Sequence, residues 1–277
     1  MIFVTSQEKL AMVFGNDIMV VEGETTPFEK IALELASSED WLISQIVGDT
    51  TANEMTEDTP IFNACVTIVG CDALRRSIPA LDLVLTPNGF GIVQDKNVVP
   101  ASKERVERLI SSCITRRDYA IERLYKMLAK QASWQDSEQR RFWASSPLQE
   151  FMLVDGWNNG KKYDSRYEAF LAMRNEAAPF VTKLAERYIS SEVMKRISLA
   201  VCSMGDSEDD RNDRETCANV AYIILRHLNG HPFKHQLIDP IVNCLRENDD
   251  DWKNSSVAAY YAEAAFKNVK DSKGYWF

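Results

Sequence analysis

The sequence predicts a mainly α protein made of two helical modules, with a short β-hairpin inserted in the first. Apolar residues recur at helical spacing through most of the chain, turn-forming residues separate these segments, and two short extended runs meet at a Pro-Asn-Gly turn. A length of 277 residues suits one large or two modest domains, and we expect two. The predicted organisation is an N-terminal helical domain at 1–132, a connector at 133–163 and a C-terminal helical domain at 164–277.

Composition excludes several classes of protein. The hydrophobic share of 45% and the charged share of 26% are ordinary for a packed globular chain. The net charge of −9 argues against a surface that coats nucleic acid. No run approaches the roughly 20 apolar residues of a membrane helix, and the first residues lack the pattern of a signal peptide. We therefore expect a cytoplasmic location, with no specific nucleic acid and no membrane as partner.

Two helices are predicted before the hairpin. The segment from Pro27 to Val47 carries apolar residues three, four or seven positions apart, as one buried helix face requires, and Gly48 ends it. The next segment begins at Pro60 and is apolar on most sides as far as Arg75 and Arg76. This breadth predicts a helix buried in the centre of the module.

Residues 81–99 carry the clearest local signal in the chain. Asn88 and Gly89 supply the positive φ angles of a tight turn, and Pro87 presets the residue that enters it. Ser102 is then the expected N-cap of a long helix with an apolar stripe of about six turns. The stripe consists of Val106, Leu109, Ile110, Cys113, Ile114, Ile121, Leu124 and Leu128.

The connector interrupts the helical pattern and is rich in aromatic residues. It contains Trp134, Trp143 and Trp157, with Arg140 and Arg141 between them. These side chains could line a cleft between the modules, which would suit a helical ligand-binding protein or an enzyme. The alternative is a connector that packs its tryptophans on one domain.

The second module is again helical. Its expected helices are Arg166–Glu176, Pro179–Cys202, Asp213–Leu228, Gln236–Glu247 and Asn254–Val269. The acidic loop at 205–213 lacks the ligand spacing of a helix-loop-helix calcium site, so we expect it to be solvated. Short sequence echoes at an offset of 153, such as Ser37-Ser38-Glu39 with Ser190-Ser191-Glu192, leave open whether the modules are a duplication or share a helical alphabet by chance.

Few residues offer chemistry. His227, His231 and His235 are spaced by four, as metal ligands on one helix face would be, but Gly230 and Pro232 interrupt that helix. The chain contains no nucleophile elbow, dinucleotide fingerprint or Walker loop. The six cysteines have neither metal nor redox spacing and are expected to be buried thiols. We expect no catalytic residue, no cofactor and no metal.

The N-terminal half also carries a resemblance to a family. The runs NACVTIVGCDALRRSIPALDLV, TPNGFGIV and NVVPASKERVERL resemble an uncharacterised family encoded in prophage-like gene clusters of Bacteroides-type bacteria. Proteins of this kind are similar in size and helical character to the head-tail connector or adaptor proteins of tailed phages. The resemblance covers about the first 130 residues and implies a bacterial host, with portal or tail proteins, or other copies of the chain, as partners.

The function expected from this resemblance is structural. A ring adaptor needs a helical body and an extended element that reaches a neighbouring subunit, and residues 81–99 could be that element. The candidate assembly residues are Leu85, Pro87, Asn88, Gly89, Phe90, Ile92 and Val93. The alternatives are a hairpin packed on its own domain, the ligand-binding protein or enzyme described above, and a regulator that binds another protein through its helix faces.

Overall fold

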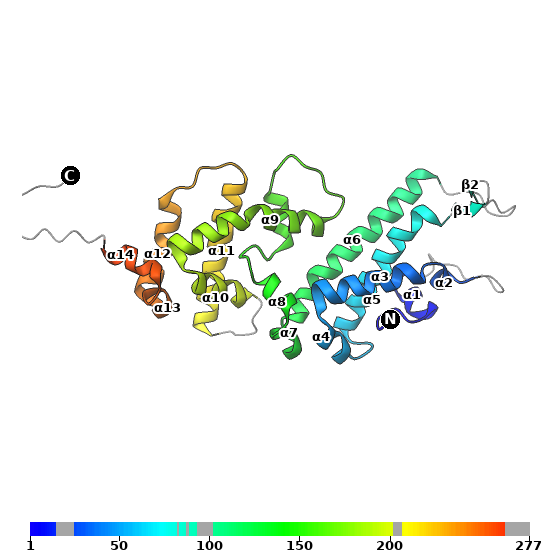
Figure 1. Ribbon diagram of the computed structural model, residues 1–277, viewed down its shortest axis with the longest axis horizontal. Helices are drawn as coiled ribbons and strands as arrows, with labels where there is room; N and C mark the ends of the chain where they lie inside the picture. Colours follow the sequence, from blue (N-terminus) through cyan, green and yellow to red (C-terminus); the bar gives the residue numbers. More distant parts are fainter. Residues whose placement is uncertain (15–24, 82, 87–88, 93–101, 202–206, 264–277) are drawn as a thin grey trace, which may run out of the picture.

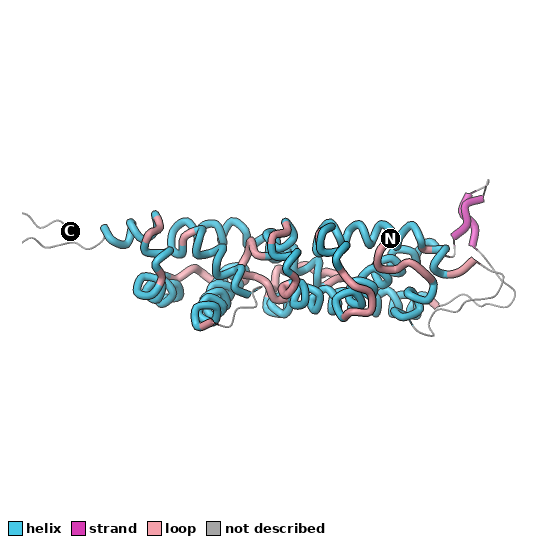
Figure 2. Tube along the Cα trace, turned by 90° about the horizontal axis from the view of Figure 1, so that it is seen from below, coloured by secondary structure: helices cyan, strands magenta, loops and turns pink. Residues whose placement is uncertain are grey.

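The computed structural model describes residues 1–14, 25–81, 83–86, 89–92, 102–201 and 207–263. The described chain is mainly helical, which confirms the predicted class. It forms an elongated body with the N-terminal helices toward one end and the C-terminal helices toward the other (Figures 1 and 2). None of the described helices is long and apolar enough to cross a membrane.

The N-terminal group of helices, α1 to α8, extends beyond the predicted limit at residue 132. Its elements are α1 (Gln7–Phe14), α2 (Pro27–Lys30), α3 (Ala32–Leu42), the π-helical turn η2 (Ile43–Val47), α4 (Asp49–Glu54), α5 (Pro60–Ser77), the 3-10 turn η3 (Ile78–Ala80), α6 (Lys103–Leu128), α7 (Ala132–Gln135) and α8 (Glu138–Trp143). Two four-residue strands, β1 (Leu83–Thr86) and β2 (Gly89–Ile92), lie between α5 and α6 in the chain.

The C-terminal group of helices, α9 to α14, follows a 3-10 turn, η4 (Phe151–Gly156). Its elements are α9 (Arg166–Leu184), the π-helical turn η5 (Ala185–Ile189), α10 (Ser191–Val201), α11 (Glu208–Leu228), α12 (His235–Asn248), α13 (Asp250–Lys253) and α14 (Ser256–Glu263). Separate domains at the predicted boundaries stay a prediction, because one buried apolar cluster runs through both groups.

Two predicted helix boundaries in this half were wrong. Pro179 lies inside α9 instead of starting a new helix, and the break comes at Ser190. Pro179 is tolerated because it lies on the exposed face of α9, as does Asn175, whose carbonyl loses its helical partner and can face solvent. Helix α11 begins earlier than predicted because Ser207 caps it, so part of the predicted acidic loop forms its first turn.

Helix α5 is the centre of the N-terminal group, and α1, α3 and α6 all pack on it. The Thr59 hydroxyl accepts a hydrogen bond from the backbone N–H of Phe62 at 3.4 Å, and Pro60 occupies the first turn, where a missing N–H costs little. Residues on nearly every side of α5 are buried. The central burial predicted from its apolar breadth is therefore confirmed.

The two groups share an unusual turn. Each has a long helix that ends in a π-helical turn, and a residue with positive φ then starts the next helix. This residue is Gly48 in the first group (φ 83°, ψ 145°) and Ser190 in the second (φ 79°, ψ 152°). Glycine suits such a backbone, whereas serine is strained in it.

A tryptophan closes this turn in both groups. The Trp134 Nε1–H donates to the Ile46 carbonyl at 2.9 Å, and the Trp252 Nε1–H donates to the Tyr188 carbonyl at 2.9 Å. Ile46 and Tyr188 each lie two residues before the positive-φ residue. Each tryptophan is the third residue of a four-residue helix, α7 or α13.

The two tryptophan bonds align the two groups of helices with a residue offset that differs from the offset of the similar tripeptides in the sequence. Ile46 and Tyr188 are 142 positions apart, whereas the echoes are offset by 153. The offset of 153 pairs Ser38, in the middle of α3, with Ser191, the first residue of α10. The sequence echoes are therefore not the structural equivalents.

Candidate functional site

The first candidate site is the predicted assembly segment, 81–99. Strands β1 and β2 pair antiparallel, with Leu85 opposite Phe90 and Thr86 opposite Gly89. Gly89 therefore lies in a strand, and its predicted place in the turn was wrong by one position. The predicted assembly residues within the strands are Leu85, Gly89, Phe90 and Ile92, and those outside the described residues are Pro87, Asn88 and Val93.

The strand pair lies at one extreme of the molecule, beyond the adjacent ends of α5 and α6 (Figures 1 and 2). In the described part of the chain, each strand has one partner strand, so no strand pairs with the outer edges. A two-stranded hairpin alone is marginally stable in water, and an open edge is a template for pairing with another chain. This position and these edges favour a role in binding a partner.

Helix α6 is uncovered beside the strand pair. Its apolar stripe is buried in its second half, where Ile121 and Leu124 are fully buried. In the first half, by contrast, Leu109 is 39% exposed, and Leu81, at the end of α5, is 46% exposed. The predicted stripe thus continues past the core and ends as an exposed apolar surface next to the strands.

The alternative site between the modules is not built as predicted. Trp134, Trp143 and Trp157 are all buried in the apolar core. A groove of about 460 Å³ does lie where α7 and α8 face α9 and α10, and Arg140 and Arg141 line it. The tryptophans do not line this groove, because they pack inward and join the two groups of helices.

A buried ionic cluster holds the two groups together. The Arg117 guanidinium donates to Asp72 at 2.8 Å, to Asp118 at 2.9 Å and to the Ser165 hydroxyl at 2.7 Å. The second carboxylate oxygen of Asp118, Oδ2, accepts a hydrogen bond from the Ser165 hydroxyl at 2.9 Å and one from the backbone N–H of Tyr167 at 3.1 Å. Since Ser165 and Tyr167 lie at the start of α9, this carboxylate ties α6 to the positive end of the α9 dipole.

The charges of Asp72 and Arg117 are stabilised by their partners. Burial alone would raise the pKa of Asp72, but the hydrogen bond from Arg117 and the charge of Arg75 outweigh it and hold the pKa below its usual value. Burial alone would lower the pKa of Arg117, but the charge of Asp118 and the hydrogen bond to Asp72 outweigh it and raise the pKa. General acid-base catalysis needs a pKa near the working pH, so these shifts favour a structural role.

An aromatic cluster continues the same junction. Trp143 of α8 packs on Phe170 of α9, with ring centroids 5.3 Å apart, and Phe151 of η4 stacks on Phe170 at 4.7 Å. Arg174 donates to the carbonyls of Phe142 at 2.7 Å and of Trp143 at 2.8 Å, and so caps the C-terminal end of α8. The beginning of the C-terminal group therefore covers Trp143 and caps the end of α8, whereas Phe142 stays 50% exposed.

The histidines are spread as the sequence predicted, and each described contact is structural. His227 stacks on Phe180 at 3.8 Å, and His235 lies edge-on to Tyr188 at 5.7 Å. Gly230, with φ 78°, lies between the first two histidines. In the described ranges, no group of three potential ligands is placed to hold a metal ion.

The cysteines were predicted to be buried. Cys65, Cys71, Cys113 and Cys217 confirm this prediction, whereas Cys244 is exposed on α12 and contradicts it. Cys202 lies outside the described residues. Burial raises the pKa of Cys65, so this thiol stays protonated and unreactive.

In the acidic run Asp249-Asp250-Asp251, Asp249 is buried, whereas Asp250 and Asp251 are exposed. Arg196 of α10 donates to Asp251 at 2.7 Å and to Asp213 of α11 at 2.9 Å, and it also pairs with Asp249. The hydrogen bond to Asp249 and the nearby Asp213 raise the pKa of Arg196 although burial opposes this. The run thus ties α10, α11 and α13 together.

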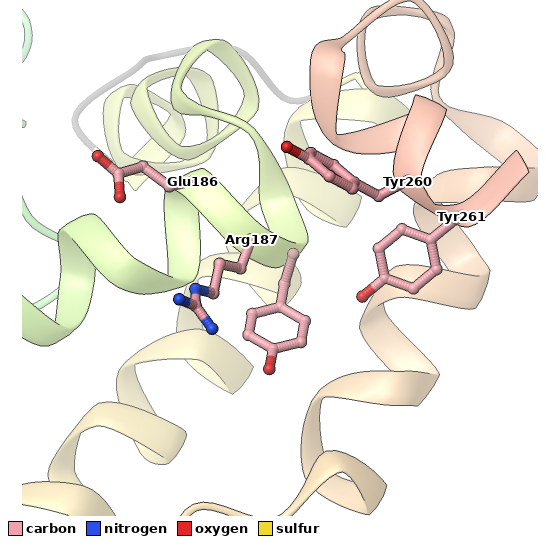
Figure 3. Close-up of a pocket in the computed structure, with 5 residues that line it drawn as sticks. Glu186, Arg187, Tyr260 and Tyr261 are labelled. Carbon is pink, nitrogen blue, oxygen red and sulfur yellow. The ribbon is translucent and has the colours of Figure 1, made fainter. Parts of the chain in front are cut away.

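The second candidate site lies at the opposite extreme of the molecule, at α14. A hollow of about 620 Å³ lies between η5 and α14 and is lined by Glu186, Arg187, Tyr188, Tyr260 and Tyr261. Figure 3 shows Glu186 and Arg187 on the η5 side and the two tyrosines on the α14 side. This site was not predicted from the sequence. A pattern that could have indicated it is the pair Trp134 and Trp252, each followed nine positions later by an aromatic residue, Trp143 or Tyr261.

The protein is therefore mainly helical, and its two candidate surfaces, the strand pair β1–β2 and the hollow at α14, lie at opposite ends of the molecule. Residues 29–142 match the model of a family of unknown function, DUF6712. This match runs from α2 into α8 and includes the strand pair, but it leaves out α1 and the C-terminal group. No curated protein and no solved structure shows a significant match to the chain.

Proposed function

We propose that this protein is a non-enzymatic structural subunit that acts by protein-protein assembly. Its two helical modules form the body, and the segment 81–99, inserted in the first module, is the element that contacts a neighbouring subunit. The observation that carries this proposal is the position of β1 and β2, with open edges, beyond the helical body and beside the exposed apolar start of α6.

Two kinds of contact are available at this end. The outer edge of a strand can accept a strand from a partner through backbone hydrogen bonds, which need no particular side chain. The exposed Leu81 and Leu109 supply apolar area that gains free energy when a partner covers it, at about 25 cal/mol per Å². Together they combine backbone pairing with hydrophobic burial, as stable subunit interfaces do.

The resemblance of the N-terminal half narrows the proposal to a phage or prophage particle. In this setting the chain is a head-tail connector or adaptor subunit, and its partners are other copies of itself or portal and tail proteins. It is made in the cytoplasm of a bacterial host and joins the particle there. The net charge of −9 suits a body beside which DNA passes without sticking.

The test is the mass of the protein in solution, measured by light scattering over a concentration series. We compare the full chain with a variant that lacks residues 85–93 and with one that carries a glycine-serine linker of equal length in their place. The proposal expects the full chain to form oligomers and both variants to lose them, while circular dichroism shows unchanged helix content. Oligomers that persist in both variants would contradict the assigned role of this segment.

A further inference from the structure

We propose that the surface formed by η5 and α14 binds the N-terminal helices of a second copy of this chain. This inference rests on the proposed function and names the partner and the contact. Three observations carry it: the two groups of helices have the same order of elements, Trp143 at the end of the first group is covered within the chain, and the equivalent Tyr261 is only partly buried among the residues that the structure describes.

The first step is the equivalence of the two groups. In both, a long helix ending in a π-turn is followed by a shorter helix, two further helices, a four-residue helix with a central tryptophan and a last helix. The bonds from Trp134 to Ile46 and from Trp252 to Tyr188 place the four-residue helix on the π-turn in the same way in both groups. On this inference, the C-terminal group is a diverged copy of the unit that the family model matches at 29–142, with different packing between its other helices.

The second step is the junction inside the chain. In the last helix of the first copy, α8, the beginning of the second copy covers one side chain, Trp143, whereas its neighbour Phe142 is 50% exposed. Trp143 is only 4% exposed because Phe151 and Phe170 pack on it, and Arg174 binds the end of α8. This junction shows which part of one copy fits the end of another.

The third step is the equivalent end of the second copy. Tyr261 lies nine residues after Trp252, as Trp143 lies nine residues after Trp134. Tyr261 is only partly buried, and Tyr260 beside it is 74% exposed. The hollow of about 620 Å³ lies at this position (Figure 3), where within the first copy the rings of the next copy pack.

The fourth step is the occupant. Phe170 lies 18 residues before Tyr188, and Phe28, at the start of the first copy, lies 18 residues before Ile46. Phe28 is only partly buried, and Leu33, one turn further along, is 81% exposed. The start of the first copy thus offers the type of surface that α9 offers at the junction.

The two surfaces lie toward opposite ends of the elongated molecule, α2 and α3 near one end and α14 at the other (Figure 1). A contact between them is head to tail. Such a contact leaves one free surface of each kind after every addition, and it produces a closed ring or an open filament.

The experiment uses one variant for each surface. Tyr260→Glu places a charge on the α14 surface, and Leu33→Glu places one on the α2–α3 surface. Both residues are exposed, so neither change disturbs the core. Tyr222→Glu, at a tyrosine of α11 that is 54% exposed, is the matched control. Light scattering follows the mass of each full-length protein with rising concentration.

We expect the natural chain and the Tyr222→Glu variant to grow beyond dimers, and each of the other two variants alone to remain monomeric. An equimolar mixture of Tyr260→Glu and Leu33→Glu is expected to stop at dimers, because one intact surface of each kind remains. Assembly of Tyr260→Glu or Leu33→Glu alone to the mass of the natural chain would overturn the inference, as would a natural chain that stays monomeric throughout.

Two further outcomes separate this inference from the proposed function and from another occupant. If deletion of 85–93 abolishes assembly while Tyr260→Glu does not, the proposed function stands and this inference fails. Hydrogen exchange of Ser256–Glu263 in a dilute, monomeric sample tests the chain's own C-terminal residues. Protection there that is lost when residues 264–277 are deleted would assign the surface to those residues and overturn the inference.

Discussion

Single residues at the junction illustrate how charge can hold a helical protein together. Arg117 is 2% exposed and touches three partners from three parts of the chain. A buried ion pair of this kind adds little stability compared with an apolar core, but removing one member leaves the others charged and unpaired. The cluster therefore matters more for how α9 is placed on α6 than for the total stability.

This argument gives a prediction for Arg117. Arg117→Met leaves the buried carboxylate of Asp118 without its cation, whereas Asp72 keeps its pairs with Arg75 and Arg76, so the free energy of unfolding is expected to fall by about 3–5 kcal/mol. The matched control is Lys126→Met, which removes an exposed pair with Glu122 and is expected to cost at most about 0.5 kcal/mol. Urea denaturation measures both, and equal losses in the two variants would contradict the role of the cluster.

The sequence indicated little of this residue-scale chemistry. In the sequence, Arg117 and Asp118 are two of many charged residues on an amphipathic helix, and Asp72 is a polar residue in a mostly apolar helix. Only the crossing of α5, α6 and the start of α9 brings the three together. Because Asp72 and Ser165 lie 45 and 48 positions from Arg117, no local pattern could have predicted the cluster.

At the scale of elements, the long helices were predictable and their ends were less so. Periodicity placed α5, α6 and α12 to within a few residues, because a helix face buried against a core repeats every 3.6 residues. Proline misled the prediction for α9, since Pro179 is tolerated on its solvent side. The true break depends on the π-turn at η5, which tryptophan Trp252 stabilises from a distant part of the chain.

The residues with positive φ after the two π-turns give a second prediction. Ser190→Gly is expected to raise the free energy of unfolding by up to about 1 kcal/mol, because relief of about 1–3 kcal/mol of strain exceeds the entropy cost of glycine and the loss of the serine cap. Gly48→Ala is expected to lower it, since φ is 83° there and a Cβ atom would lie 2.8 Å from Gln139 Oε1.

Thermal and urea unfolding of the two variants check this prediction. The matched control is Gly160→Ala, at a glycine with φ 72° and open space around it, where backbone strain acts without a contact. A destabilised Ser190→Gly variant would show that the serine hydroxyl, which accepts from the Val193 N–H at 3.2 Å, outweighs the strain.

At the scale of the whole molecule, the connector proves to be part of the core. The tryptophans predicted to line a cleft are instead buried in the core, and Trp143 of α8 packs on Phe151 and Phe170 of the following segment. This arrangement couples the two groups of helices. The assembly proposed above would use the α14 surface at one end of the molecule and the strand pair at the other.

The coupling between the groups gives a third prediction. Phe170→Ala removes the ring that packs on Trp143 and Phe151, and we expect a loss of about 3–5 kcal/mol. We also expect unfolding followed by tryptophan fluorescence and by circular dichroism to separate, because the two groups lose their shared packing. Tyr222→Ala, at an exposed ring, is the control, and coincident transitions in both variants would contradict the coupling.

The sequence by itself determined the helical class, the central burial of α5 and the stripe of α6, because periodicity and caps are local signals. The tertiary structure alone decided the ionic junction, the inward packing of the tryptophans, the register between the two groups and the open surface at α14. These depend on contacts between residues far apart in the chain, and the identity of a residue does not show which distant partner will cover it.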